Sequence, residues 1–216
     1  MQHTINIFKN LHKNLSGSGV AFTLIRALEN DDWEEKDIDV ALATVGTIAD
    51  VVPLLGENRT IVQLGLKAMN EMCHPERSAS IRLGCDARSR RTSAPIFDFA
   101  RSILKEDEAI TSTHIGFRLA PRINASGRLA DPLIALHGLL EGGENLARLH
   151  SLNLERQEAT ERHMEIAETL IKDGKILLVR SAAFHPGIIG LIAGRLSERY
   201  GRPSIVACEE GDTLTC

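Results

Sequence analysis

Asp50 is the residue of this sequence whose setting most clearly suggests a chemical role. It follows the mostly small or apolar residues 43–49 and precedes the apolar residues 51–55. An ionised carboxylate among apolar side chains costs several kcal/mol unless it is paired, hydrogen-bonded or bound to a metal. Two interpretations stay open: a helix cap or turn residue ahead of Pro53, or a metal ligand at the end of an apolar element.

A second group of chemically interesting residues lies in APRINASGRL, residues 120–129. Arg122, Asn124, Ser126 and Arg128 surround Gly127 there. Two guanidinium groups, an amide and a hydroxyl on a short glycine-containing loop would suit phosphate, because arginine presents a fork of donors that matches phosphate oxygens. A salt-bridged surface turn fits the same residues equally well, since no glycine-rich P-loop pattern is present.

A third group is FHPGIIG, residues 184–190, between a predicted strand and a predicted helix. The N–H groups of a helix N-terminus at such a junction point to the carboxyl edge of the sheet, where anions usually bind. His185 could add a donor to them. The alternative is that His-Pro-Gly only turns the chain into the helix.

The elements that would position these groups follow from the spacing of apolar residues. Helical spacing predicts helices over 17–29, 38–48, 58–72 and 96–104. Pro53 is expected to turn the chain between the second and third of these helices, because proline cannot continue a helix.

Two segments differ from their surroundings in amino-acid composition. Residues 29–39 hold seven acidic side chains and are predicted to form a solvated connection. Residues 73–95 hold five arginines and almost no apolar periodicity, so they are predicted to be an insertion loop. A disordered surface loop is favoured there over a phosphate-binding one, because no aromatic residue is interleaved with the charges.

The last third of the sequence predicts an α/β arrangement. Residues 143–172 form a long, mostly polar helical pattern, which is typical of a connector between domains. KILLVR (175–180) and PSIVAC (203–208) read as parallel strands on either side of a helix over 186–200. One βαβ unit needs a larger sheet around it, so the second domain is expected to be incomplete.

Composition sets broad limits on the protein. A chain of 216 residues, 43% of them hydrophobic, can bury a sizeable core, and its net charge of −4 gives no global attraction to nucleic acid. The spacing of the four cysteines matches neither a metal site nor a disulfide framework, so reduced thiols are predicted. No signal peptide or membrane span is recognisable, which predicts a cytoplasmic protein.

The order and wording of the motifs resemble one family. The matching segments are SGSGVAF (16–22), TVGTIADVVPLLGENR (44–59), GFRLAPRINASGRL (116–129) and FHPGIIGLIAGRLSERYGRPSIV (184–206). In this order they are similar to the RecJ family of single-strand-specific 5′→3′ DNA exonucleases, within the DHH phosphoesterase superfamily. The resemblance runs from about residue 14 to residue 208 and leaves out the arginine-rich segment 73–95.

The resemblance implies a metal-dependent phosphodiesterase acting in DNA repair and recombination. Asp50 matches the aspartate of the family's T-V-A-D-V-V-P-L motif, a ligand of the catalytic Mn²⁺ or Mg²⁺ pair. Such a role would account for a buried carboxylate, because a divalent cation stabilises it. Single-stranded DNA is the implied partner, and single-stranded-DNA-binding protein is a second one.

The resemblance also implies where substrate lies and how the chain is divided. Residues matching the family's R-x-N-A-x-G-R loop and histidine-containing motif are Arg122, Asn124, Arg128, His185, Gly187 and Gly190. Residues 1–142 would be the largely helical C-terminal part of a DHH domain, 143–173 a connecting helix, and 174–216 the first βαβ unit of the DHH-associated, nucleic-acid-binding domain. The predicted fold class is therefore α/β.

The departures from the family pattern matter as much as the matches. The Asp-His-His string and the upstream aspartates are absent, and a glycine-rich segment expected after Cys216 is missing. The sequence is therefore predicted to be an interior piece with an incomplete two-metal site and no activity of its own. Two alternatives remain: a DHH phosphoesterase acting on short oligonucleotides or cyclic dinucleotides, and a non-catalytic nucleic-acid-binding remnant.

Overall fold

The computed structural model describes residues 14–28, 37–73, 94–104 and 108–216. Most of the acidic segment and of the arginine-rich segment predicted as a loop lies outside these described residues. The described residues form two compact units. Unit 1 combines those up to Pro121 with His137–Leu146, and unit 2 combines Arg122–Leu136 with Ala147–Cys216.

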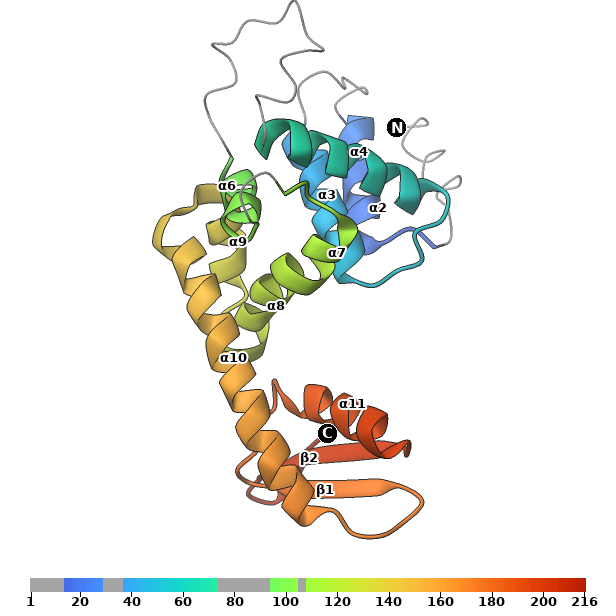
Figure 1. The fold of residues 1–216 in the computed structure, drawn as a ribbon, viewed down its shortest axis with the longest axis vertical. Helices are drawn as coiled ribbons and strands as arrows, with labels where there is room; N and C mark the ends of the chain where they lie inside the picture. Colours follow the sequence, from blue (N-terminus) through green and yellow to red (C-terminus); the bar gives the residue numbers. More distant parts are fainter. Residues whose placement is uncertain (1–13, 29–36, 74–93, 105–107) are drawn as a thin grey trace, which may run out of the picture. The chain divides into compact units, whose positions relative to one another are not determined.

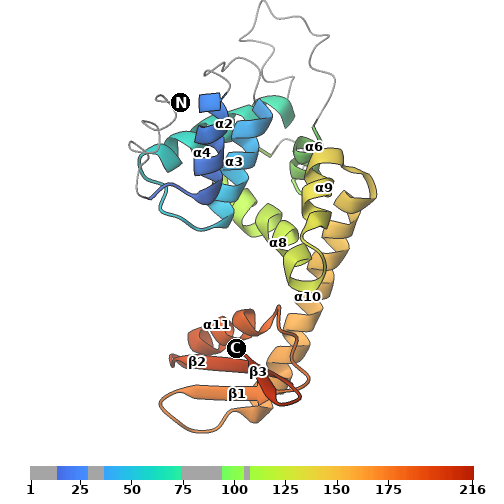
Figure 2. The same cartoon turned by 180° about the vertical axis from the view of Figure 1, so that it is seen from behind.

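Unit 1 is built on three packed helices, which confirm the predicted helical segments. They are α2 (Gly17–Leu28), α3 (Asp37–Ala49) and α4 (Glu57–Cys73). Both views show α3 packed against α2 and α4 (Figures 1 and 2). The apolar faces of the three helices meet in a small core formed by Phe22, Val40, Ala43, Ile61 and Ala68.

Short helices follow in unit 1. They are α6 (Pro95–Ser102), α7 (Ser112–His114) and the π-helical turn η1 (Ile115–Leu119). Pro95 opens α6, where its missing N–H costs no helical hydrogen bond. Two further helices, α8 (Ala120–Leu129) and α9 (Leu133–Glu141), each contribute residues to both units.

Unit 2 contains the predicted βαβ unit, and the α/β fold class is confirmed. Its elements are most of α8, the start of α9, α10 (Gly143–Leu170) beyond its first turn, β1 (Leu177–Ser181), α11 (Ile189–Tyr200), β2 (Ser204–Glu210) and β3 (Thr213–Thr215). The strand order is β1-β2-β3, with β1 and β2 parallel and β2 and β3 antiparallel. Gly201 ends α11 in the left-handed conformation, with φ of 63°, that glycine adopts without strain.

The core of unit 2 joins one face of the sheet to two helices. Leu177, Val179 and Val206 point inward from the strands. Buried residues of α11 and of α10 pack on them: Ile189, Ile192, Leu196, Ala159, Met164 and Ala167. The polar helix α10 therefore does more than connect, because its thin apolar side covers part of this core.

Two further predictions can be compared with the structure. Cys73, Cys208 and Cys216 are free cysteines, and Cys85 lies outside the described residues. Among the helices that the structure describes, none combines the length and hydrophobicity that crossing a bilayer requires.

Candidate functional site

Asp50 lies directly after the last residue of α3, and it is exposed to solvent. Its backbone N–H donates to the carbonyl oxygen of Gly46 at 3.0 Å. The prediction of a buried carboxylate among apolar side chains is therefore wrong. The apolar residues of α3 face the neighbouring helices, whereas beyond Ala49 the chain turns outward and leaves Val51 87% exposed.

The backbone beside Asp50 is strained. Val51 has a φ of 54°, in the left-handed region that a β-branched residue rarely adopts. This conformation costs about 1–2 kcal/mol for a residue with a Cβ atom. Val51 N–H donates to the carbonyl oxygen of Ile48 at 3.1 Å, so the left-handed residue ends α3 and sets the direction in which the chain leaves Asp50.

Asp50 alone does not make a metal centre. Within the described residues, no group of three or more His, Cys, Asp or Glu side chains is close enough to hold a metal ion. Mg²⁺ and Mn²⁺ are held by several oxygen ligands, of which one exposed carboxylate can supply only a part. The described residues therefore do not fit a complete two-metal site.

The APRINASGRL segment is a helix, α8, and the prediction of a loop there is wrong. Pro121 lies in its first turn, where proline is tolerated, and alanine, arginine and leucine favour helix. Ser126 is buried, and its hydroxyl donates to the carbonyl oxygen of Ile123 at 2.8 Å, so its hydrogen bond is made within α8. The polar residues of the motif are thus fixed by a helix, with Asn124 on its exposed side.

Arg122 is joined to α10 within unit 2. Its Nε donates to Nδ1 of His150 at 3.1 Å. Burial, and then the positive charge of Arg122, lower the pKa of His150. The imidazole is therefore neutral at pH 7 and accepts this hydrogen bond, which orients the guanidinium group of Arg122.

Arg128 joins the end of α8 to the turn before α11. Its Nη1 donates to the carbonyl oxygen of Gly187 at 3.2 Å. A Cβ atom on Gly187 would lie only 1.9 Å from the carbonyl oxygen of Arg128, so the two backbones are in direct contact. The structure thus brings together two of the three groups of residues singled out in the sequence.

His185 is exposed in the turn that precedes α11. Its Nδ1 accepts a hydrogen bond from the backbone N–H of Gly187 at 3.1 Å. In the neutral imidazole the proton is therefore on Nε2, which can donate to a ligand. Gly190 follows in the first turn of α11, and no atom lies within 4 Å of the position that a Cβ would occupy there.

Arg156 of α10 was not predicted as a site residue, although it lies close enough to Arg128 for their positive charges to interact. Its guanidinium group donates twice to Oδ1 of the buried Asn153, from Nη2 at 3.1 Å and from Nε at 3.4 Å. Burial, followed by the positive charges of Arg128 and Arg195, lowers the pKa of Arg156. The available sequence signal was its spacing of three from Asn153 and four from Thr160, which places three polar residues on one side of a helix.

Curated proteins similar to this chain include single-stranded-DNA-specific exonucleases named RecJ. The single-stranded-DNA-specific exonuclease RecJ of Bacillus subtilis is 36% identical over 203 residues, which cover 90% of this chain and 23% of that protein. RecJ of Thermus thermophilus is 31% identical over 213 residues, covering 95% of this chain and 28% of that protein. The chain thus spans about a quarter of the length of these curated relatives. No protein-family model matches it.

Solved structures agree with the sequence comparison. A crystal structure of exonuclease RecJ bound to manganese superposes with a TM-score of 0.70 at 30% identity, over 91% of this chain and 47% of that one. RecJ of Thermus thermophilus in complex with Mg²⁺ gives a TM-score of 0.73 at 29% identity, over 94% of this chain and 30% of that one. By sequence and by fold, the chain is therefore RecJ-like and corresponds to a part of these longer proteins.

Proposed function

We propose that this chain is the part of a metal-dependent 5′→3′ single-stranded-DNA exonuclease that holds the DNA. The observation that carries the proposal is the contact of Arg128 with Gly187, which joins the two predicted substrate-binding motifs. The hydrogen bond from Arg122 to His150 links the first of these motifs to α10. We call the surface formed by α8, the middle of α10 and the start of α11 the basic face.

The chemistry of this surface suits a nuclease that must process any sequence. Guanidinium groups neutralise phosphates and give affinity without reading bases. Arg122 and Arg128 are six residues apart on one helix, and His185 adds a donor through Nε2. The basic face is therefore expected to bind the DNA backbone in many sequence contexts.

Asp50 is proposed to supply one carboxylate to a metal site completed by residues other than those the structure describes. The manganese- and magnesium-bound relatives support this assignment. Because one carboxylate cannot hold a metal pair, we expect the 216-residue chain to bind single-stranded DNA without cutting it.

The proposal extends to the finer assignments that the resemblance implies. They are a role in DNA repair and recombination, contact with single-stranded-DNA-binding protein, a cytoplasmic location, and a division into part of a DHH domain (1–142), a connecting helix (143–173) and the start of the DHH-associated domain (174–216).

Replacing Arg122 and Arg128 by glutamine should weaken binding of single-stranded DNA and flatten its salt dependence. Each phosphate neutralised on a single strand contributes about 0.7 to the slope of log Kobs against log salt, so the double variant should lose about 1.4. The measurement is fluorescence anisotropy of a 3′-labelled oligothymidylate in EDTA at several salt concentrations.

The matched control for this pair is Arg180→Gln. Arg180 is an exposed arginine of the sheet in unit 2, ion-paired with Glu209 at 3.3 Å, and its replacement should leave the slope unchanged. If the double variant unfolds at the wild-type temperature and has the same salt slope as the wild type, Arg122 and Arg128 do not contact the DNA.

A further inference from the structure

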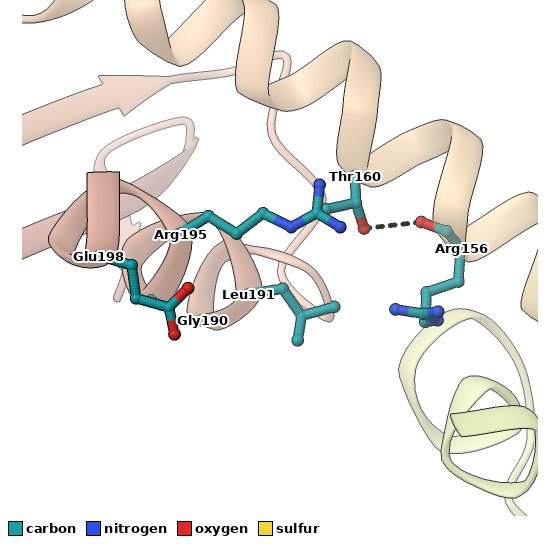
Figure 3. A pocket seen from close by; sticks show the side chains of 7 residues that line it. Arg156, Thr160, Gly190, Leu191, Arg195 and Glu198 are labelled. Atoms are coloured by element: carbon teal, nitrogen blue, oxygen red, sulfur yellow. Dashed lines mark hydrogen bonds between the residues drawn. The ribbon is translucent and has the colours of Figure 1, made fainter. Parts of the chain in front are cut away.

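A cavity lies between α10 and α11 inside unit 2 (Figure 3). Its volume is about 260 Å³, and its walls are formed by Arg156, Thr160, Gly190, Leu191, Gly194, Arg195 and Glu198. Pockets for drug-sized ligands measure about 300–1,000 Å³, so this one suits a smaller group. Of the residues singled out in the sequence, only Gly190 lines it.

The cavity has two arginines that form no ion pair within the described residues, and the carboxylate of Glu198 lines the same cavity. Arg156 comes from α10, and Arg195 reaches from α11 toward Thr160 of α10 (Figure 3). Within the described residues, no carboxylate lies within 4.0 Å of either guanidinium group. Two positive charges without an ion-pair partner on one cavity repel each other, and an anion between them would relieve that repulsion.

One of the two arginines is held in place by the protein. Asn153 is buried and accepts two hydrogen bonds from Arg156, which fixes the plane of the guanidinium group. The hydroxyl of Thr160, also buried, donates to the carbonyl oxygen of Arg156 at 2.7 Å. A fixed guanidinium group is a better anion ligand than a mobile one, because less side-chain entropy is lost on binding.

Two glycines of α11, Gly190 and Gly194, line the side of the cavity opposite α10 and carry no side chain into it. A glycine inside a helix costs about 1 kcal/mol relative to alanine. A Cβ atom on Gly190 or Gly194 would meet no atom within 4 Å, so packing does not require glycine at either position. Their absence of side chains leaves backbone exposed to the cavity, where a sugar-phosphate chain could approach closely.

We propose that this cavity is a phosphate subsite in which Arg156 and Arg195 hold one backbone phosphate of single-stranded DNA. The assignment rests on the proposed function and adds two residues to the basic face. Arg128 is close enough to Arg156 to act on its charge, so this subsite continues the surface that begins on α8. A free phosphate ion offers the same oxygens, and the test separates the two sources.

The first arm of the test measures anisotropy of a 3′-labelled oligothymidylate in EDTA, with the full chain. Arg156→Gln and Arg195→Gln should each weaken binding about tenfold, as expected for hydrogen bonds to a charged group. The double variant should lose little more than either single variant, because both arginines serve one phosphate. Its salt slope should fall by about 0.7, the value for one phosphate.

Two further variants sharpen this arm. Glu198→Gln should tighten binding a few-fold, because a carboxylate on the cavity wall repels phosphate. Arg199→Gln is the matched control on the same helix, since Arg199 is ion-paired with Glu168 outside the cavity and its loss should leave affinity near that of the wild type. Thermal unfolding of each variant shows that the fold is retained.

The second arm compares thermal unfolding in sodium phosphate and in sodium chloride of equal ionic strength. Phosphate should raise the melting temperature of the wild type but not that of the Arg156→Gln/Arg195→Gln variant. Stabilisation by phosphate with unchanged DNA affinity in that variant would make the cavity a site for free anions and overturn the assignment to DNA.

The outcomes also separate this inference from the proposed function. If the wild type binds the oligonucleotide and the folded cavity variants bind it equally well, the subsite is wrong and the proposed function stands. If the wild type does not bind single-stranded DNA, both proposals fail.

Discussion

Replacing Gly187 with alanine is expected to destabilise unit 2 by about 3 kcal/mol, a large effect for one methyl group. The new Cβ would lie 1.9 Å from the carbonyl oxygen of Arg128 and 2.8 Å from its carbonyl carbon. Both neighbours are backbone atoms, so no change of side-chain rotamer can relieve the clash. The turn before α11 and the end of α8 must separate, which also breaks the hydrogen bond from Arg128 to Gly187.

Urea unfolding followed by circular dichroism measures this loss, and anisotropy with labelled oligothymidylate should show weaker DNA binding. Gly194→Ala is the stability control, because its Cβ would meet nothing within 4 Å inside α11. It should raise stability by up to about 1 kcal/mol. Equal unfolding midpoints for Gly187→Ala and the wild type would contradict the described contact between α8 and α11.

Replacing Gly65 with alanine should have a comparable effect on unit 1. Its Cβ would lie 1.9 Å from Oγ1 of Thr44 and 2.7 Å from the carbonyl oxygen of Val40, where α4 crosses α3. Thr44 is fully buried and its hydroxyl donates to the carbonyl oxygen of Ile61 at 2.9 Å, so it cannot turn away without losing that bond. We expect a loss of about 3 kcal/mol, and α3, which ends beside Asp50, should shift.

Thermal unfolding tests this prediction, with Gly17→Ala as control. Gly17 is also helical, and a Cβ there would meet nothing within 4 Å. The control should unfold near the wild-type temperature. A Gly65→Ala variant as stable as the control would show that α3 and α4 are not as closely packed as described.

The sequence predicted those elements whose signal is local. Apolar spacing was sufficient for α2, α3 and α4, and continuous apolar runs were sufficient for the parallel strands β1 and β2. The α8 segment was misjudged because glycine, serine and asparagine suggest a loop. Its helix depends on Ala125 and Ser126 being buried, which is a property of the folded unit.

The two main differences between prediction and structure at the candidate site also arise from tertiary packing. The burial of Asp50 was inferred from its apolar neighbours in sequence, but those neighbours pack away from it on α3. Arg156 was overlooked in a long polar helix, because nothing in the helix itself shows that Arg195 of another element faces it. Sequence periodicity identifies which side of a helix is buried, whereas the partners on that side are set by the fold.

The central claim is that single-stranded DNA binds along α8, the middle of α10 and the start of α11. Backbone amide chemical shifts of the ¹⁵N-labelled chain, titrated with oligothymidylate in EDTA, test it most directly. We predict that the largest changes cluster at residues 122–129, 150–160 and 185–195. Changes confined to the exposed sheet residues around Leu178 and Ile205, or to unit 1, would contradict the account.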